Sequence, residues 1–510
     1  MLARVASEAL AGLESHPIEV EADVVTAAPA FTIVGLPDLA VQESRERVRA
    51  AIVNSNYEFP SRRITVNLAP ADVRKEGPSF DLPIALAFLL ATGQARSRVA
   101  DVAVVGELAL DGALRPVTGV LALAESARRR GLRRLLLPLA NAREAALVAG
   151  LEVLPVTSLR EAAAVLERGN GHCRVSVSPD ELLHAGATYE VDFADVVGQE
   201  QAKRALEVAV AGAHNVLMVG PPGSGKTMLA RRLPTVMPRP TIDEAIDVTR
   251  IYSVAGLLPH DSPLVTCRPF RAPHHTCSSA ALVGGGPTPR PGEVSLAHLG
   301  VLFLDEFPEF RLSSLEALRQ PLEDGEVTIS RALTSLTFPA RIMLVAAMNP
   351  CPCGWRGDRE RECTCKTHRI EQYQAKLSGP LLDRIDLHLE VARLTPRDQR
   401  VRAVGESSAA IRERVERARE RQLARLAGTG VYANAHMTAR HLRRLCRIHP
   451  DASERLDRAY ERLRLTARAC DRVLKVAQTI ADLEGAHEIR ETHVAESISY
   501  RSRVLKPIPR

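Results

Sequence analysis

HNVLMVGPPGSGKT, residues 214–227, decides the fold of this chain. An apolar run typical of a buried strand passes directly into G-x-x-x-x-G-K-[ST], and the helix-forming stretch MLARRL follows. Such a loop wraps backbone N–H groups around phosphate oxygens, and the helix start adds a positive dipole end. Lys226 would neutralise β- and γ-phosphate charge, and Thr227 would bind Mg²⁺. The predicted phosphate-binding residues are Gly220, Pro221, Pro222, Gly223, Ser224, Gly225, Lys226 and Thr227.

Two further apolar runs end in polar side chains that suit the same site. VLFLDEF at 301–307 ends a strand with Asp305, which could reach Mg²⁺ beside Thr227, and with Glu306, which could polarise an attacking water. A buried acid pair without a cation would be costly, which disfavours a purely structural role. IMLVAAMN at 342–349 ends in Asn349, which could orient that water or merely cap a strand. Together these motifs predict an ATP- and Mg²⁺-dependent hydrolytic site.

The three motifs together resemble those of the AAA+ ATPases, in which Asn349 would match sensor 1. The resemblance narrows at RPFRAPHHTCSSAALVGGG (268–286), NPCPCG (349–354) and GPLLDRIDLHLEV (379–391). These segments are similar to the magnesium-chelatase-like AAA+ family that includes the ComM (YifB) proteins of bacterial DNA processing. The match covers almost the whole chain. It implies an α/β multidomain protein with a Lon-protease-like N-terminal α/β domain, an AAA+ P-loop three-layer α/β core and a C-terminal helical lid.

The resemblance also implies two arginines that complete the ATP site. Arg384, in LLDRID, would reach the nucleotide of a neighbouring subunit, and an ion pair with Asp383 or Asp386 is the alternative. Arg468, in LTARACDRVLKVAQTI, matches the sensor 2 arginine, and Arg472 one turn later is its rival. An arginine that acts on a neighbour requires an oligomer, and the family implies a homo-hexameric ring.

The segment LEDGEVTISRALTSLTFPARI (322–342) has two β-prone stretches around a short polar connection. It resembles the presensor 1 hairpin of MCM-type helicases, whose basic tip points into the ring channel. Arg331 matches that tip and would hold DNA phosphate without reading bases. The alternative is an exposed hairpin arginine without a partner.

Four cysteines lie within fifteen residues, as Cys351-x-Cys353 and Cys363-x-Cys365. Four thiolates can hold one structural Zn²⁺ in a closed tetrahedral site, around a short knuckle that contains Trp355. His368 could replace one cysteine, and reduced structural cysteines remain the alternative.

His274 and His275 follow RAP in the region that matches a family insertion. A metal role needs converging ligands, and the sequence offers no acidic partner nearby. We therefore expect a structural or loop-positioning role.

KEGPSFDLPIALAF (75–88) and the segment from Gly106 to Pro138 resemble the Lon protease domain. The family's catalytic serine is matched by Ser79, but Leu121 stands where its catalytic lysine is expected. A serine nucleophile needs a base, and a leucine cannot act as one. We expect a Lon-like fold without proteolysis.

Composition sets the broad class. The 510 residues are 45% hydrophobic and 25% charged, which is typical of a soluble globular protein, and no apolar run approaches the roughly 20 residues of a membrane span. Nine cysteines in a chain of this length, without a visible secretory signal, predict a cytoplasmic protein rather than a disulfide framework. The net charge of +6 permits binding to a polyanion without diagnosing it. Predicted divisions are residues 1–170 (Lon-like), 171–191 (linker), 192–393 (AAA+) and 394–510 (helical lid).

The leading hypothesis is an ATP-driven hexameric motor that moves along single-stranded or branched DNA, with other DNA-processing proteins as possible partners and no membrane. By resemblance, the process is branch migration during natural transformation and recombination. One alternative is a chelatase-type remodelling subunit that assists metal insertion into a porphyrin. A chaperone or protease component is a third, which the missing Lon lysine disfavours.

Overall fold

The computed structural model describes residues 2–97, 101–168, 175–184, 189–259, 262–286, 289–330, 335–358, 360–393, 405–463 and 465–501. The chain forms two compact units. Unit 1 comprises Met1–Gly186 and Ile242–Thr266, and unit 2 comprises Ala187–Thr241 and Cys267–Arg510. The segment 242–266 thus joins the N-terminal unit although it lies between two parts of the other, which the sequence analysis did not anticipate. The predicted domain limits stay predictions.

Unit 1 is built on a mixed sheet of seven strands in the order β3-β4-β2-β1-β5-β8-β9. β1 pairs antiparallel with β2, and β5, β8 and β9 run parallel beside it. β2 and β4 alternate between buried and more exposed positions, as strands do when only one face packs on a core. The strands are β1 (Leu2–Ala11), β2 (Glu14–Val25), β3 (Ala30–Val34), β4 (Arg63–Ala69), β5 (Val102–Val104), β8 (Arg134–Pro138) and β9 (Glu152–Val156), with a small hairpin of β6 (Glu107–Leu108) and β7 (Leu114–Arg115).

The helices of unit 1 pack on this sheet and on each other. α2 is apolar on all sides and is almost entirely buried against β1 and β2. α9, from the inserted segment, packs on α3. The helices are α1 (Leu39–Asn54), α2 (Asp81–Thr92), α3 (Val120–Arg129), α4 (Ala142–Ala145), α5 (Leu159–Arg168), α6 (Pro179–His184) and α9 (Ile242–Ala255).

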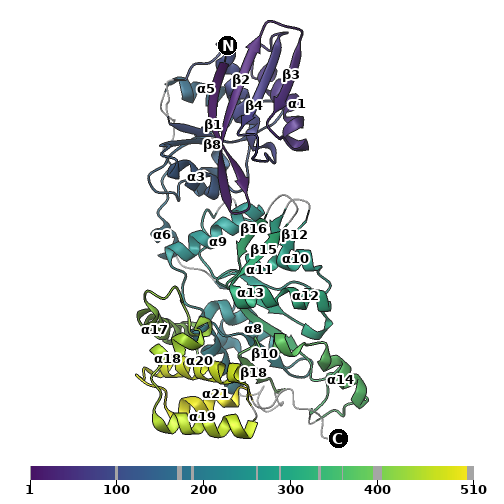
Figure 1. Cartoon of the computed structure of the whole chain (residues 1–510), viewed down its shortest axis with the longest axis vertical. Coiled ribbons are helices and arrows are strands. Elements are labelled where there is room, and N and C mark those ends of the chain that lie inside the picture. The colour runs from purple at the N-terminus through teal and green to yellow at the C-terminus, as the bar shows by residue number, and fades with distance from the viewer. Residues whose placement is uncertain are drawn as a thin grey trace. The chain divides into compact units, whose positions relative to one another are not determined.

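Unit 2 contains a five-stranded sheet in the order β11-β14-β17-β10-β18, and every neighbouring pair is parallel. Figure 1 labels its strands β10 and β18. The central strands β10, β14 and β17 are buried throughout, which explains why they read as continuous apolar runs. Because the strands are parallel, the segments that follow them meet at one edge of the sheet. The strands are β10 (Val216–Val219), β11 (Phe270–Arg271), β14 (Val301–Leu304), β17 (Met343–Met348) and β18 (Leu387–Glu390).

Helices and two hairpins surround this sheet. The helices are α7 (Glu200–Gly212), α8 (Lys226–Val236), α10 (Ser279–Val283), α11 (Glu293–Leu296), α12 (Leu312–Ala317), α13 (Arg319–Asp324), α14 (Thr367–Ala375) and α15 (Gly379–Leu382). The hairpins are β12 (Gly284–Gly285) with β13 (Arg290–Pro291), and β15 (Glu326–Ser330) with β16 (Ser335–Pro339).

The C-terminal part of unit 2 is helical, as expected, and its helices gather together in Figure 1. They are α17 (Ser408–Leu426), α18 (Ala439–Leu445), α19 (Pro450–Leu463), α20 (Ala467–Glu484) and α21 (Glu491–Ser499). α17 and α20 both pack on α7, which ties this bundle to the sheet. The predicted fold class, an α/β multidomain protein with a P-loop core and a helical C-terminal part, is therefore confirmed. In the part of the chain that the structure describes, no helix combines the length and apolarity that a membrane span needs.

Candidate nucleotide site and cysteine cluster

The P-loop joins β10 to α8, which begins at Lys226. Gly220 allows a close approach at the start of this loop, since a Cβ there would lie 2.2 Å from the carbonyl oxygen of Val391. The loop therefore follows directly from the buried centre of the sheet, as the sequence predicted.

Lys226 points back into the loop rather than toward solvent. Its Nζ donates to the carbonyl oxygens of Gly220 at 2.7 Å and Pro221 at 3.0 Å, and to Oδ1 of Asn349 at 3.4 Å. Burial lowers the pKa of this ammonium group, and the nearby carboxylate of Asp305 acts against that shift. The lysine thus connects the P-loop to the end of β17.

The two candidate Mg²⁺ ligands also meet. Oγ1 of Thr227 donates to Oδ2 of Asp305 at 2.7 Å, and Oδ1 of Asp305 accepts from the backbone N–H of Glu306 at 2.9 Å. A hydroxyl and a carboxylate are hard oxygen donors of the kind Mg²⁺ takes beside nucleotide phosphates. The structure therefore brings together four residues from the segments that follow three adjacent strands, β10, β14 and β17: Lys226, Thr227, Asp305 and Asn349.

Glu306 has a partner that the sequence analysis missed. Oε2 of Glu306 lies 3.0 Å from Nδ1 of His275, so the expectation that this histidine has no acidic partner nearby was wrong. The neighbouring ring of His274 lies 4.2 Å away, centroid to centroid, and bonds Thr276 in its own turn. The structure explains the contact, because β11 lies beside β14 and the segments after neighbouring parallel strands meet.

The backbone of Glu306 has φ of 52°, the left-handed region that non-glycine residues enter rarely. Its side chain is 57% exposed, in contrast to the apolar strand before it. A turn of this kind frees the carboxylate from the sheet and suits a group that must meet a solvent molecule.

Arg384 and Arg468 do not lie beside the P-loop. They line a cavity of about 600 Å³ elsewhere in unit 2. Arg384 forms an ion pair with Glu323. The hydrogen bond and the charge of Arg384, with a smaller effect of the Arg468 charge, hold the pKa of Glu323 below its usual value. The alternative partners expected from sequence were Asp383 and Asp386, and Asp386 instead lies 3.6 Å from Arg472. The other cations of the lining are Arg341, Arg472 and Lys475.

This cavity lies at the opposite edge of the sheet from the P-loop. Asn215 immediately precedes β10, Ile342 precedes β17 and Asp386 precedes β18, and all three line the cavity. P-loop residues are not among its lining residues. With four residues at about 3.3 Å each, β10 alone places about 13 Å between the two edges. Arg384 and Arg468 are therefore brought together with each other, and not with the nucleotide site of their own chain.

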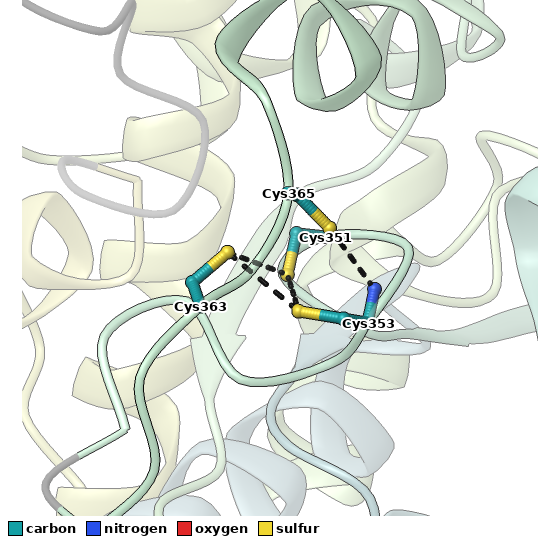
Figure 2. Close-up of side chains that lie close together, drawn as sticks. All are labelled: Cys351, Cys353, Cys363 and Cys365. Carbon is teal, nitrogen blue, oxygen red and sulfur yellow. Dashed lines mark hydrogen bonds between the residues drawn. The ribbon is translucent and has the colours of Figure 1, made fainter.

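The four predicted cysteines converge (Figure 2). Sγ of Cys351 lies 3.4 Å from that of Cys353 and 3.6 Å from that of Cys363, and all four sulfurs lie within 4.8 Å of one another. Thiolates about 2.3 Å from a tetrahedral ion are about 3.8 Å apart, so the spacing fits one Zn²⁺. His368 is not part of the cluster found among the described residues.

The thiols of the cluster differ in their pKa shifts. Against burial, bonds from the backbone of Trp355 and Thr364 and from the Cys351 side chain lower the pKa of Cys353 to about 6. The backbone N–H of Cys353 in turn donates to Sγ of Cys365 at 3.4 Å. Burial raises the pKa of Cys363 and of Cys365, so the spacing of the four sulfurs, and not the titration of the thiols, is the observation that fits the ion.

The predicted DNA-contacting hairpin exists as β15 and β16, with Ser330 opposite Ser335. Arg331 lies outside the described residues, so its role stays a prediction.

In unit 1, Ser79 lies in a short 3₁₀ turn (Pro78–Phe80), and Leu121 is buried on α3 with 1% exposure. The N–H of Leu121 donates to Oε1 of Glu144 at 2.8 Å. The ammonium group of Lys75 bonds the Pro70 carbonyl. Leu121, predicted to stand at the position of the Lon lysine, is thus an apolar core residue.

Comparison with known families adds three matches along the chain. The model described as magnesium chelatase, subunit ChlI, matches residues 192–399, that of subunit ChlI of Mg-chelatase matches 20–141, and the ChlI C-terminal model matches 405–501. The chain is 44% identical over 504 residues to protein YifB of Salmonella typhimurium, which covers 98% of this chain and 97% of that protein. The chain belongs to the ComM/YifB family of magnesium-chelatase-like AAA+ proteins. It is accordingly an AAA+ ATPase.

A second relative that matches along nearly its full length is the competence protein ComM of Haemophilus influenzae. The two chains are 43% identical over 512 residues, which cover 99% of this chain and 98% of that protein. Partial matches are shorter. Lon protease 2 of Bacillus subtilis is 32% identical over 154 residues (28% of this chain, 27% of that protein). The magnesium-chelatase 67 kDa subunit of Chlorobaculum parvum is 26% identical over 164 residues (31% and 23%).

Proposed function

We propose that this AAA+ ATPase is a ring-shaped, hexameric DNA motor that uses ATP hydrolysis for branch migration in DNA processing such as natural transformation and recombination. In its own nucleotide site, Lys226 and the P-loop residues bind the phosphates. Thr227 and Asp305 would hold Mg²⁺, which supplies charge neutralisation at the phosphates when it is bound. Glu306 accepts a proton from the attacking water, and Asn349 orients that water.

The main support for a ring is the distance of Arg384 and Arg468 from the P-loop of their own chain. Arg384 and Arg468 line a cavity at the amino edge of the sheet, whereas the P-loop is at the carboxyl edge. A guanidinium that stabilises phosphoryl-transfer charge must touch the nucleotide. These arginines therefore serve the ATP of a neighbouring copy, and a closed ring gives every copy one such neighbour. Arg468 is the proposed sensor 2 residue, and Arg472, held near Asp386, is its rival.

Full-length similarity supports the motor over the chelatase alternative. The relative named for competence matches 99% of this chain, whereas the relative named as a magnesium-chelatase subunit matches 31%. The N-terminal domain does not separate the two functions, because the family model at 20–141 also carries the chelatase subunit's name. The described arms of the β15–β16 hairpin would carry Arg331 to DNA phosphate.

Three further parts of the proposal concern the setting of the motor. Cys351, Cys353, Cys363 and Cys365 hold one structural Zn²⁺, which their spacing supports. The Lon-like part does not cleave peptides, since Leu121 occupies the place of the base. The protein works in the cytoplasm, where DNA-processing proteins are its partners.

The decisive experiment compares what stimulates ATP turnover. Purified protein is assayed alone, with single-stranded DNA, with a branched duplex, and with porphyrin plus a chelatase partner. We expect stimulation by DNA and none by porphyrin. Stimulation by porphyrin and its partner without any response to DNA would replace the motor with the chelatase function.

A further inference from the structure

We propose that the cysteine knuckle, described at residues 351–358 and 360–365, is a positioning device for ATP: by closing around its ion it presses Gly354 against the P-loop and fixes Asn349. The inference rests on the proposed ATP site and goes beyond it, because it assigns the knuckle a direct part in nucleotide affinity.

The first observation is a direct contact. A Cβ on Gly354 would lie 2.6 Å from Cδ and 2.7 Å from Cγ of Pro222, and 3.8 Å from Cγ of Asn349. Real Cβ atoms do not approach other heavy atoms below 3.0 Å, and a proline ring cannot turn away as a flexible chain end can. The knuckle backbone therefore lies flush on the P-loop, with room for a hydrogen and for nothing larger.

The second observation is the path of the chain. Asn349 immediately follows β17, and the first cysteine, Cys351, comes two residues later and is 0% exposed. The Asn349 side chain accepts from Lys226 at 3.4 Å. The same few residues thus carry a cluster ligand at one end and a contact to the P-loop lysine at the other.

The third observation is a brace on the far side of the knuckle. α14 begins two residues after Cys365. Burial raises the pKa of its Tyr373, whose hydroxyl meets a hydrogen bond from the Asn349 backbone. Gln374 donates from Nε2 to the carbonyl oxygen of Pro350 at 3.5 Å. The segment that leaves the cluster therefore returns to hold the segment that enters it.

Through these contacts, metal binding at the cysteines would change the affinity of the P-loop for ATP. Four thiolates gathered by an ion would close the loop between β17 and α14 and couple its shape to metal binding. When the loop opens, Gly354 no longer limits the movement of Pro222, and Asn349 loses its fixed backbone. Nucleotide binding should therefore weaken before the fold of unit 2 is lost.

The knuckle contains its own matched control. Gly354 and Gly357 both have positive φ, 84° and 79°, so a side chain strains the backbone equally at both. A Cβ on Gly357 would meet nothing within 4 Å. Gly354→Ala and Gly357→Ala therefore differ chiefly in the contact with the P-loop.

The experiment measures zinc per chain, melting temperature and affinity for a fluorescent ATP analogue in both variants. With zinc retained in both, we expect Gly354→Ala to weaken nucleotide affinity about 10-fold or more and Gly357→Ala to stay within about 2-fold of the wild type, because displacement of about 1 Å suffices for such losses. Equal affinities in the two variants overturn the inference. A wild-type protein that binds no ATP would instead overturn the proposed function.

Two further arms cover the case in which Gly354→Ala disturbs folding or zinc binding. Pro222→Ala removes the ring atoms that the new Cβ would meet, so adding Gly354→Ala to Pro222→Ala should weaken affinity far less than adding it to the wild type, and Pro222→Ala alone is the reference for the double variant. Wild-type protein stripped of zinc by a chelator should lose affinity for the same analogue and regain it with added Zn²⁺. An equal loss from Gly354→Ala in both backgrounds, together with unchanged affinity after zinc removal, refutes the positioning role.

Discussion

Glu306 and Asp305 are adjacent, yet their surroundings differ sharply. Asp305 is held by the Thr227 hydroxyl and by a backbone N–H, whereas the Glu306 side chain is 57% exposed and is met by His275. The bound carboxylate suits a metal ligand, and the exposed one suits a base that must reach water. The surroundings of Asp305 and Glu306 therefore distinguish their expected roles, and the sequence of two neighbouring acids could not show this difference.

Glu306→Gln should therefore bind ATP but hydrolyse it about 100-fold or more slowly, because the amide keeps the shape and loses the basicity. Nucleotide affinity and single-turnover hydrolysis measure the two effects separately. Glu309→Gln is the control, since Glu309 is a nearby exposed acid that pairs with Lys376 at 3.3 Å. Normal turnover by Glu306→Gln would remove it from the mechanism.

At the scale of elements, sequence predicted the buried strands of unit 2 well because their apolar runs lead straight into chemically distinctive residues. Asp305 and Asn349 could be assigned to one site from the carboxyl ends of parallel strands alone. The partnership of His275 with Glu306 could not, since it depends on which strand lies beside which. The cysteine spacing predicted the cluster, but its contact with Pro222 depends on loop geometry that no spacing encodes.

The β15–β16 hairpin allows a test of DNA binding at its tip. Arg331→Ala should weaken DNA binding about equally across sequences and lower the salt slope by about one unit per phosphate contact, multiplied in a ring by the number of subunits engaged. Basal ATPase should survive, while DNA-stimulated ATPase and branch migration fall together. Arg417→Ala, an exposed arginine of α17, is the control. Full DNA-coupled activity in Arg331→Ala at several salt concentrations would leave Arg331 a surface cation.

Helix α9 is held in unit 1 by a buried carboxyl group. The hydroxyl of Ser253 bonds Oε1 of Glu144, and the backbone N–H of Gly119 donates to the Ser253 carbonyl at 3.1 Å. Burial raises the pKa of Glu144, so the folded state favours its neutral form. The resulting stabilisation is complete below the ordinary carboxyl pKa and declines as pH rises through the raised one.

Ser253→Ala should consequently destabilise unit 1 by about 1–3 kcal/mol, because it leaves a buried carboxyl oxygen short of a partner. Hydrogen exchange over residues 242–255 should rise with it, and the loss should be greater at neutral than at acidic pH. Ser262→Ala, which removes a bond within its own turn, is the comparison. Unchanged exchange in α9 would show that apolar packing alone holds the helix.

At the scale of the whole molecule, the two edges of the unit 2 sheet carry complementary halves of the proposed ATP site. Arg384→Ala should abolish most hydrolysis while leaving ATP binding near normal, since its proposed target is the nucleotide of another copy. Mixing Arg384→Ala with Lys226→Ala subunits should restore some activity, at interfaces where an intact P-loop meets an intact arginine. Turnover across mixing ratios measures this. Absence of recovery in rings shown to be mixed would contradict action between copies.

Because residues 242–266 belong to unit 1, the chain passes between its two units three times, after Gly186, after Thr241 and after Thr266. A single genetic crossover near residue 186 would take α3 from one relative and α9 from the other. It would therefore separate residues that pair within one protein, such as Glu125 and Arg250, which are 2.8 Å apart. Unit 1 can therefore be transplanted intact only as two separate pieces of coding sequence. Chimaeras of relatives that move both pieces should fold, and those that move the first alone should carry a mismatched helix.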